Sequence, residues 1–289
     1  MTTTEVSVTE PGLYPGMPED VYHSDPVPGG SLSSTGAKKL LPPSCPAKFR
    51  HWLDYGQAPK DQFDLGHAAH LKVLGTGAEV VVVEAPDWRT KAAKEAKAAA
   101  HAAGKVPLLE SDHERVVDMA AAVRRHSIAG PLLAPDSGQA EVSAFWIDQA
   151  TGVWCRARYD FLRHAVPGRR RLIVDYKTTT CADPETIRRT VNSFGYFQQD
   201  AHYGDGAVRL GLADDPAFVL VFQETEAPYL ITVVQLDAVA RRIGRDLNAQ
   251  ALGIYAECVR TGEWPGYSND IELIALPAWV ERQHTKEIW

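Results

Sequence analysis

One short stretch constrains this chain more than any other: residues 171–179, which read RLIVDYKTT. Its apolar LIV run predicts a buried strand, and an acid, an aromatic and a base follow directly. Because strand side chains alternate between two faces, Asp175 and Lys177 are expected on one face and Tyr176 on the other. A carboxylate beside an ammonium at a strand end suits a hard cation, an attacking water and a phosphate. The same pair is also common as a plain surface ion pair, so other residues must decide.

The composition is that of a globular protein with a sizeable core, because 45% of the 289 residues are hydrophobic and 23% are charged. No apolar run approaches the roughly 20 residues that cross a bilayer, and the polar, acidic start lacks a signal core. These features predict no membrane contact and a cytoplasmic location. The four cysteines form no CxxC pair, which argues against zinc ribbons and iron–sulfur clusters. The net charge of −7 argues against nucleic-acid binding through bulk charge, but it permits a local basic groove.

The order of elements predicts an α/β fold. Residues 1–30 are rich in Pro, Gly, Ser and Thr, and we expect a flexible, loosely held lead segment there, followed by a single domain over 31–289. Three strands joined by short loops in the middle of the chain indicate an antiparallel meander. Ser111 and Glu114 resemble a helix-capping box. Helices are predicted over 31–41, from 46, over 64–74, 91–103, 111–127, 184–210 and 237–260, and strands over 79–84, 140–147, 153–162, 172–179, 217–224 and 229–236.

Side-chain parity in the middle strands places acids together. Arg158 and Asp160 share a face of the strand over 153–162. If that strand pairs with the opening stretch through the connecting loop, Asp160 and Asp175 meet on a common surface. Carboxylate oxygens are preferred ligands of Mg²⁺, which takes one or two of them together with water and substrate phosphate. The Tyr176 carbonyl and a helix histidine would complete such a site.

Two histidines compete for that last position. His67 and His70 lie three residues apart on the helix over 64–74, and most helix histidines are exposed or satisfied rather than ligands. His70, within an apolar stretch, is the one expected to point inward. The chemistry that such a site supports is phosphodiester hydrolysis, in which a metal-bound water attacks and Lys177 orients the water or stabilises the phosphorane.

Four ordered motifs resemble the PD-(D/E)xK nucleases of the RecB type. Asp160 followed by Asp175-Tyr176-Lys177 is similar to the family pattern, with Arg-Tyr-Asp in place of a strict Pro-Asp. Residues 66–70 match the G-x-x-x-H helix of that group, and residues 199–203 match its Q-x-x-x-Y motif. The similarity is strongest to the RecE-like exonucleases of phages and prophages. It covers most of the chain after residue 30, through the segments 33–52, 140–146, 196–203 and 264–267.

The resemblance implies a restriction-endonuclease-like core, a central mixed sheet flanked by helices with helical additions. It implies an Mg²⁺-dependent exonuclease, with Mn²⁺ as a possible substitute, that degrades double-stranded DNA from its ends, 5′ to 3′. The remaining 3′ strand would pass to a single-strand annealing protein for recombination in the cytoplasm of a bacterial host. Identical subunits would form a ring. By position, the implied metal ligands are His70, Asp160, Asp175 and Tyr176. The implied catalytic residues are Lys177, Asp175, Asp160 and Glu141. The implied substrate-binding residues are Gln199, Tyr203 and Arg158.

Two other functions stay open. One is a single-strand DNA exonuclease with the same core, although the relatives of that kind usually carry a cysteine cluster that this chain lacks. The other is a DNA-end binding or scaffold protein that has lost hydrolysis, against which the intact Asp160, Asp175 and Lys177 argue. For Gln199 and Tyr203, one helical turn apart, two roles are also open: holding the DNA end or bracing the site.

Overall fold

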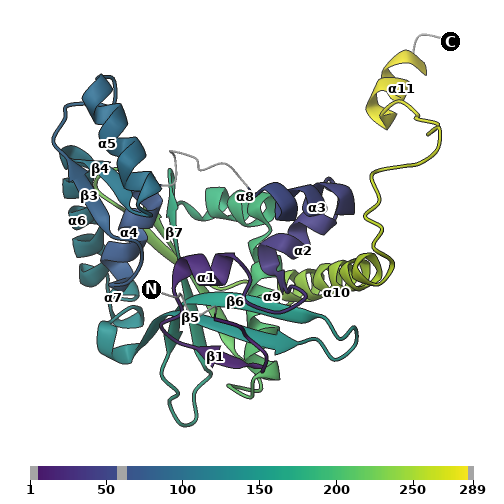
Figure 1. The fold of residues 1–289 in the computed structure, drawn as a ribbon, viewed down its shortest axis with the longest axis horizontal. Coiled ribbons are helices and arrows are strands. Elements are labelled where there is room, and N and C mark those ends of the chain that lie inside the picture. Colours follow the sequence, from purple (N-terminus) through teal and green to yellow (C-terminus); the bar gives the residue numbers. More distant parts are fainter. Residues whose placement is uncertain (1–5, 57–63, 286–289) are drawn as a thin grey trace.

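A mixed β-sheet forms the centre of the computed structural model, which describes residues 6–56 and 64–285 (Figure 1). Within these residues the sheet has seven strands, six of them in the order β1-β5-β6-β7-β8-β9, while β2 pairs with β6. The meander β5-β6-β7 is antiparallel, as predicted, and β7 and β8 are parallel. The strands are β1 (Gly12–Tyr14), β2 (Leu32–Ser33), β5 (Gly138–Ile147), β6 (Trp154–Arg163), β7 (Leu172–Thr179), β8 (Ala217–Glu224) and β9 (Ile231–Val234).

Two helices connect the parallel strands β7 and β8. Residues 184–210, predicted to be helical throughout, form α8 (Pro184–Phe194) and α9 (Tyr196–Arg209). They are separated at Gly195, whose φ of 62° places it in the left-handed region that favours glycine. The side chain of Asp183 caps α8 by accepting hydrogen bonds from the backbone of its first turn. The chain therefore turns sharply at the α8–α9 junction, above the end of β7.

Helices cover both faces of the sheet, as predicted (Figure 1). Tyr176 belongs to one core and Ile173, three residues earlier on the same strand, belongs to the other, as strand alternation requires. On one face lie α2 (Ser34–Leu40), α3 (Pro46–Tyr55), α9 and α10 (Ala238–Thr261). On the other lie α4 (Asp64–Leu74), α6 (Glu110–Arg125) and a small parallel sheet of β3 (Val80–Val83) and β4 (Val106–Leu109), which are linked by α5 (Lys91–Ala102).

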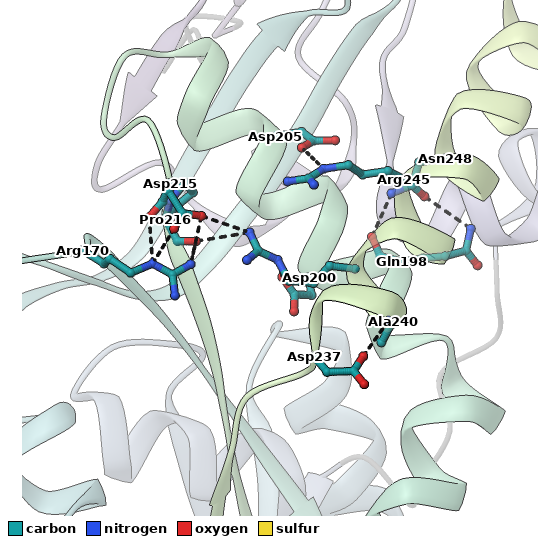
Figure 2. A network of polar contacts seen from close by, with 11 residues as sticks. Arg170, Gln198, Asp200, Asp205, Asp215, Pro216, Asp237, Ala240, Arg245 and Asn248 are labelled. Carbon is teal, nitrogen blue, oxygen red and sulfur yellow. Dashed lines mark hydrogen bonds and ion pairs between the residues drawn. The ribbon is translucent and has the colours of Figure 1, made fainter.

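Close packing and polar contacts join α9 to α10. A Cβ placed at Gly244 would collide with the carbonyl oxygen of Phe197, so glycine allows the two helices to approach. Figure 2 shows Gln198 hydrogen-bonded to Asn248, and Asp205 paired with Arg245, across this contact. The helix α10 begins where predicted, with Asp237 as its side-chain cap, and ends before the left-handed Gly262.

The amino-terminal segment corrects one expectation. Residues 6–30 are not loosely held: β1 pairs with β5, and a short helix, α1 (Glu19–His23), follows. Val8, Met17, Tyr22 and Val27 are buried around Phe145 in a small core of their own. The Pro- and Gly-rich composition hid this core because its apolar residues are irregularly spaced. Residues 1–5 lie outside the described residues.

A second expectation is also corrected. The helix α6 begins at Glu110 without a side-chain cap, so Ser111 lies inside its first turn and makes no capping box. The chain passes directly from the buried strand β4 into α6, and this packing sets where the helix starts. The short elements α7 (Ala129–Leu132) and a 3₁₀ turn (Pro135–Ser137) then lead into β5.

The carboxyl-terminal part leaves the body of the protein after Tyr267, whose hydroxyl donates a hydrogen bond to the Pro43 carbonyl oxygen, while Trp264 packs on Phe49 and Tyr255. Beyond Tyr267 the chain extends away to α11 (Ala278–Thr285), with Ile271, Leu273 and other apolar side chains almost fully exposed (Figure 1). We call residues 268–285 the carboxyl-terminal arm. Among the described residues, no helix combines the length and the apolar character that crossing a membrane requires.

Candidate active site

The antiparallel pairing of β6 and β7 brings the two central aspartates together. Phe161 pairs with Val174, so the next residues along the two strands, Asp160 and Asp175, lie side by side. The backbone N–H of Tyr176 donates to Asp160 Oδ2 over 3.0 Å. The sequence predicted that Asp160 and Asp175 would meet if these two strands paired, and the structure has this pairing.

Three candidate metal ligands converge beside this pair. His70 Nδ1 lies 3.1 Å from Glu141 Oε1, and His70 Nε2 lies 3.0 Å from Asp160 Oδ2. One ligand atom from each residue falls within 4.8 Å of the others. His67, the competing histidine, is exposed on the helix and lines the same cleft. The geometry therefore selects His70 as the histidine that meets the carboxylates.

Small residues allow α4 to lie close to the sheet. Ala68 and Ala69 are fully buried, and a Cβ at Gly66 would lie only 3.3 Å from Thr178 Oγ1 of β7. This close approach puts His70, one turn further along, over the strand ends. The glycine and the alanines are thus the reason why the histidine of this helix reaches Glu141 and Asp160.

Glu141 takes an unusual backbone conformation for a strand residue. Its φ is 53°, and the β5–β6 pairing passes from Ala140–Phe161 to Val142–Tyr159 without including it. A non-glycine residue in the left-handed region costs on the order of 1 kcal/mol or more and is held there by its surroundings. Here Arg158 Nε binds Glu141 Oε2, and His70 binds the other oxygen. The sequence placed Glu141 near the site, but nothing in it signals this backbone conformation.

Asp175 and Lys177 form a buried pair on the opposite face of β7 from Tyr176. Asp175 is fully buried, and its Oδ2 contacts the Lys177 ammonium. Its Oδ1 accepts a hydrogen bond of 2.6 Å from Gln199 Nε2 of α9. The Lys177 ammonium also lies 5.3 Å from the ring centroid of Tyr196. The alternative of an exposed surface ion pair is therefore excluded.

The remaining predicted site residues lie around this centre. Tyr176 directs its hydroxyl to Gln223 Oε1, at 2.5 Å, on the other side of the sheet. Tyr203 packs on Tyr159 and Phe218 and reaches the cleft. Arg158 is engaged by Glu141, by Ser143 Oγ and by the carbonyl oxygen of Met17, which ties the amino-terminal segment to the site.

The charges of the site shift its titration. Burial lowers the pKa of His70, but the charge and hydrogen bond of Asp160 and the charge of Glu141 raise it overall to about 9. Burial, reinforced by the charge of Asp160, raises the pKa of Asp175 to about 6 despite the neighbouring Lys177. The Lys177 pKa is raised, because Asp175 and Asp160 outweigh its burial. Burial would raise the pKa of Asp160, but His70 and Lys177 lower it.

A second lysine, which sequence reasoning did not single out, lies behind the site. Burial and the charge of Lys177 lower the pKa of Lys38 to about 8. Its ammonium donates a 2.9 Å hydrogen bond to the carbonyl oxygen of Phe194, at the end of α8. A helix lysine gives no sequence signal for such a contact, because the contact spans 156 positions of the chain.

The site opens into a cleft of about 680 Å³. Its lining includes the metal-ligand candidates, Lys177, and aromatic residues from the four helices α1, α3, α8 and α9. An adjoining cavity of about 780 Å³ shares Glu141 and Arg158 and continues past α1 toward α5. The catalytic candidates therefore face an elongated, solvent-accessible space that is large enough for part of a polymer.

Comparison with known families then decides the relationship. Residues 33–277 match the family described as a PDDEXK-like domain of unknown function, DUF3799. The chain belongs to this family. The match covers strands β5 to β9 of the sheet, both helical layers and every predicted site residue of this PDDEXK-like domain. It therefore supports the PD-(D/E)xK superfamily that the sequence motifs indicated, while the RecE-like subgroup stays a prediction.

One solved structure has a similar fold. The crystal structure of a putative exonuclease from Eubacterium rectale is similar with a TM-score of 0.56 and 12% identity, over 88% of this chain and 92% of that one. The match to the crystal structure of SSO0001 covers 67% of this chain and 88% of that one at 12% identity, with a TM-score of 0.27 that is too low to indicate a shared fold. No curated protein matches the chain.

The donor set of the site suits a hard divalent cation. An imidazole nitrogen and two carboxylate oxygens, with space for water in the cleft, match the ligands that Mg²⁺ and Mn²⁺ take. His70, Glu141 and Asp160 are therefore the residues positioned to hold such an ion. Asp175 stands beside them, with both of its oxygens already engaged by Gln199 and Lys177.

Proposed function

We propose that this PDDEXK-like protein is a divalent-metal-dependent nuclease that hydrolyses phosphodiester bonds in DNA. The observation that carries the proposal is the convergence of His70, Glu141 and Asp160 beside the buried pair Asp175–Lys177, inside an open cleft. Metal donors and a fixed ammonium are the groups that phosphodiester hydrolysis needs. The order of the motifs along the chain and the family match support the same chemistry.

Each residue has a defined part in the reaction. A bound Mg²⁺ or Mn²⁺ supplies charge neutralisation at the phosphate and a lowered pKa for attacking water. Lys177 stays protonated because its pKa is raised, so it orients the water or stabilises phosphate oxygens as a cation rather than acting as a base. Asp175 holds that ammonium in place, and Gln199 holds Asp175. The Tyr176 carbonyl serves as a further ligand for the ion.

The finer activity we propose is exonucleolytic. The resemblance of the Gly66–His70 and Gln199–Tyr203 motifs to RecE-like enzymes supports attack on double-stranded DNA ends, 5′ to 3′, with a 3′ strand left for an annealing protein in a bacterial cytoplasm. The Eubacterium rectale protein, whose structure is described as that of a putative exonuclease, has a similar fold. Gln199 braces the site in this scheme, because its amide is buried against Asp175.

We also propose that the protein acts as a homo-oligomer. The carboxyl-terminal arm supports this, since Ile271, Leu273 and Ile274 are 96%, 101% and 86% exposed. Such a run of apolar side chains is costly in water and is typical of a surface that a partner covers. Replacing Leu273 and Ile274 by serine is expected to lower the mass measured by analytical ultracentrifugation, whereas Val82→Ser, at an exposed position of β3, is the control.

The decisive experiment uses linear duplex DNA labelled at the 5′ or the 3′ end, with Mg²⁺ or with EDTA. We expect the wild type to release the 5′ label early when Mg²⁺ is present and not when EDTA is present. We expect Lys177→Ala to release no label. Hydrolysis that survives the combined replacement of Lys177 and Asp175 by alanine contradicts the proposal. Preference for single strands would point to the single-strand exonuclease, and tight end binding without shortening would point to a scaffold protein.

A further inference from the structure

An exposed aromatic ring lines the cleft of the catalytic lysine and is separated from its ammonium by the ring of Tyr196. Phe194, the last residue of α8, is 61% exposed and lines the same cleft as Lys177. Its ring is stacked on Tyr196, with centroids 5.7 Å apart and planes 15° apart. Tyr196 in turn lies against the Lys177 ammonium and the core residue Phe222. The two rings form a short stack that begins at the catalytic lysine and ends in the cleft.

The protein holds this stack in place from behind. Lys38 donates its hydrogen bond to the Phe194 carbonyl oxygen, which fixes the end of α8. Gly195 follows in the left-handed conformation, and a Cβ there would lie 2.8 Å from Lys38 Cδ. The turn that separates Phe194 from Tyr196 thus depends on a glycine and on a lysine from α2. The ring is exposed on a braced corner, not on a loose loop.

We propose that the Phe194–Tyr196 stack is a binding platform for an unpaired nucleobase of the DNA strand being cut. This inference rests on the proposed nuclease function and names the form of substrate at that site. Every base has a π-face, and aromatic stacking contributes on the order of 1–3 kcal/mol per base. The Lys177 ammonium, at the foot of the stack and in the cleft lining, suits an adjacent phosphate.

The platform carries a consequence for the substrate. A base that stacks on Phe194 has left its own helical stack, so the nucleotide at the catalytic centre is unpaired. Opening a terminal pair costs free energy, and this cost disappears when the end is already frayed or mismatched. A duplex with an unpaired terminal nucleotide on the cut strand is therefore bound more tightly than a fully paired duplex.

The test uses the full-length protein in Ca²⁺, with oligonucleotides that carry 2-aminopurine at one end or the other. We expect fluorescence quenching for one of the two ends in the wild type and in Phe194→Trp. Phe194→Ala and Phe194→Leu are expected to lose the quenching and to bind roughly 5- to 100-fold more weakly. A terminal abasic site is expected to weaken DNA binding by the wild type by a similar factor. It is expected to cause no further loss of affinity in Phe194→Ala.

The control is Tyr55→Ala, which removes an exposed aromatic ring from the end of α3, outside the cleft lining. Thermal melting of each variant shows whether the fold is retained. If the wild type hydrolyses DNA and Phe194→Ala shows the same quenching and affinity as the wild type, the platform is overturned and the nuclease proposal stands. Retained binding in Phe194→Leu also counts against stacking. A wild type that neither binds nor hydrolyses DNA removes both proposals together.

Discussion

The side-chain amide of Gln199 donates a 2.6 Å hydrogen bond to Asp175 Oδ1 inside the protein, while the adjacent Gln198 bonds Asn248 of α10 instead. Two neighbouring glutamines of one helix therefore serve different partners. Gln199 fixes the carboxylate that holds Lys177, and Gln198 joins two helices. The pair offers a direct way to separate the bracing of the site from the stability of the fold.

We expect Gln199→Ala to reduce the single-turnover rate of DNA hydrolysis by about 10- to 100-fold, the typical effect of losing a partner that orients a site carboxylate. Gln198→Ala is the matched control. It removes the donor to Asn248 Oδ1, while Asn248 Nδ2 keeps the backbone carbonyl oxygen of residue 198. We expect it to lower the free energy of unfolding by about 1–3 kcal/mol, with the rate retained below the melting temperature. Equal rates in the two variants would contradict the bracing role.

The raised pKa of His70 predicts a pH-dependent metal affinity. With a pKa of about 9, His70 carries a proton at neutral pH, and this proton must leave before the ring binds an ion. We expect the Mn²⁺ association constant, measured by titration calorimetry, to rise roughly tenfold per pH unit between pH 6 and 8. His70→Asn has no such proton, so its weaker binding is expected to change little. A flat wild-type profile would show that His70 is not a ligand.

The packed amino-terminal segment makes a stability prediction. Val8 is 1% exposed in the small core around Phe145, whereas Val6, two residues earlier, is 46% exposed. We expect Val8→Ala to lower the free energy of unfolding by about 1–3 kcal/mol, since it removes buried methyl groups and leaves a cavity. Val6→Ala is expected to stay within about 0.5 kcal/mol of the wild type. Urea denaturation compares the two, and equal effects would mean that the segment is not part of the fold.

A buried carboxyl on the far side of α9 predicts a dependence of stability on pH. Asp200 is 1% exposed, and burial raises its pKa to about 7, although Arg241 Nε lies 3.5 Å from Oδ1. The folded protein then keeps a proton that the unfolded chain releases above the ordinary value of 3.8. The stability associated with this proton is complete below that value and is lost as the pH rises to about 7.

We therefore expect Asp200→Asn to gain stability over the wild type as the pH rises from about 4 to 7, by on the order of 1 kcal/mol per unit. Asp205→Asn is the matched control, because Asp205 lies on the same helix in an exposed pair with Arg245 (Figure 2). Its effect is expected to be small and constant over this range. Thermal melting at several pH values provides the measurement, and parallel curves for Asp200→Asn and wild type would contradict the pKa shift.

The sequence predicted the parts of the site that follow from local pattern. Period-two alternation placed Asp175 and Lys177 on one face, and side-chain parity indicated that Asp160 and Asp175 would meet if β6 and β7 paired. Helix 64–74 has its predicted bounds, because small and apolar residues favour one conformation there. These features need only neighbouring residues, which is why one sequence suffices to predict them.

Other features depend on tertiary contacts and have no local signal. The left-handed backbone at Glu141 is held by Arg158 and His70, which lie far from it in the sequence. The start of α6 is set by the buried strand before it, which overrode the apparent cap at Ser111. The exposure of Phe194 depends on where Lys38 meets α8.

The origin of the three candidate metal ligands has a consequence for the life of the protein in a cell. His70, Glu141 and Asp160 come from α4, β5 and β6, and they meet only when the helix has docked on the completed meander. A chain still emerging from the ribosome, or one that is partly unfolded, has no assembled donor set, so the proposed hydrolysis of DNA requires the folded protein. An ion that binds only the assembled ligands also favours the native state by mass action. The candidate metal site and the completed fold therefore form together.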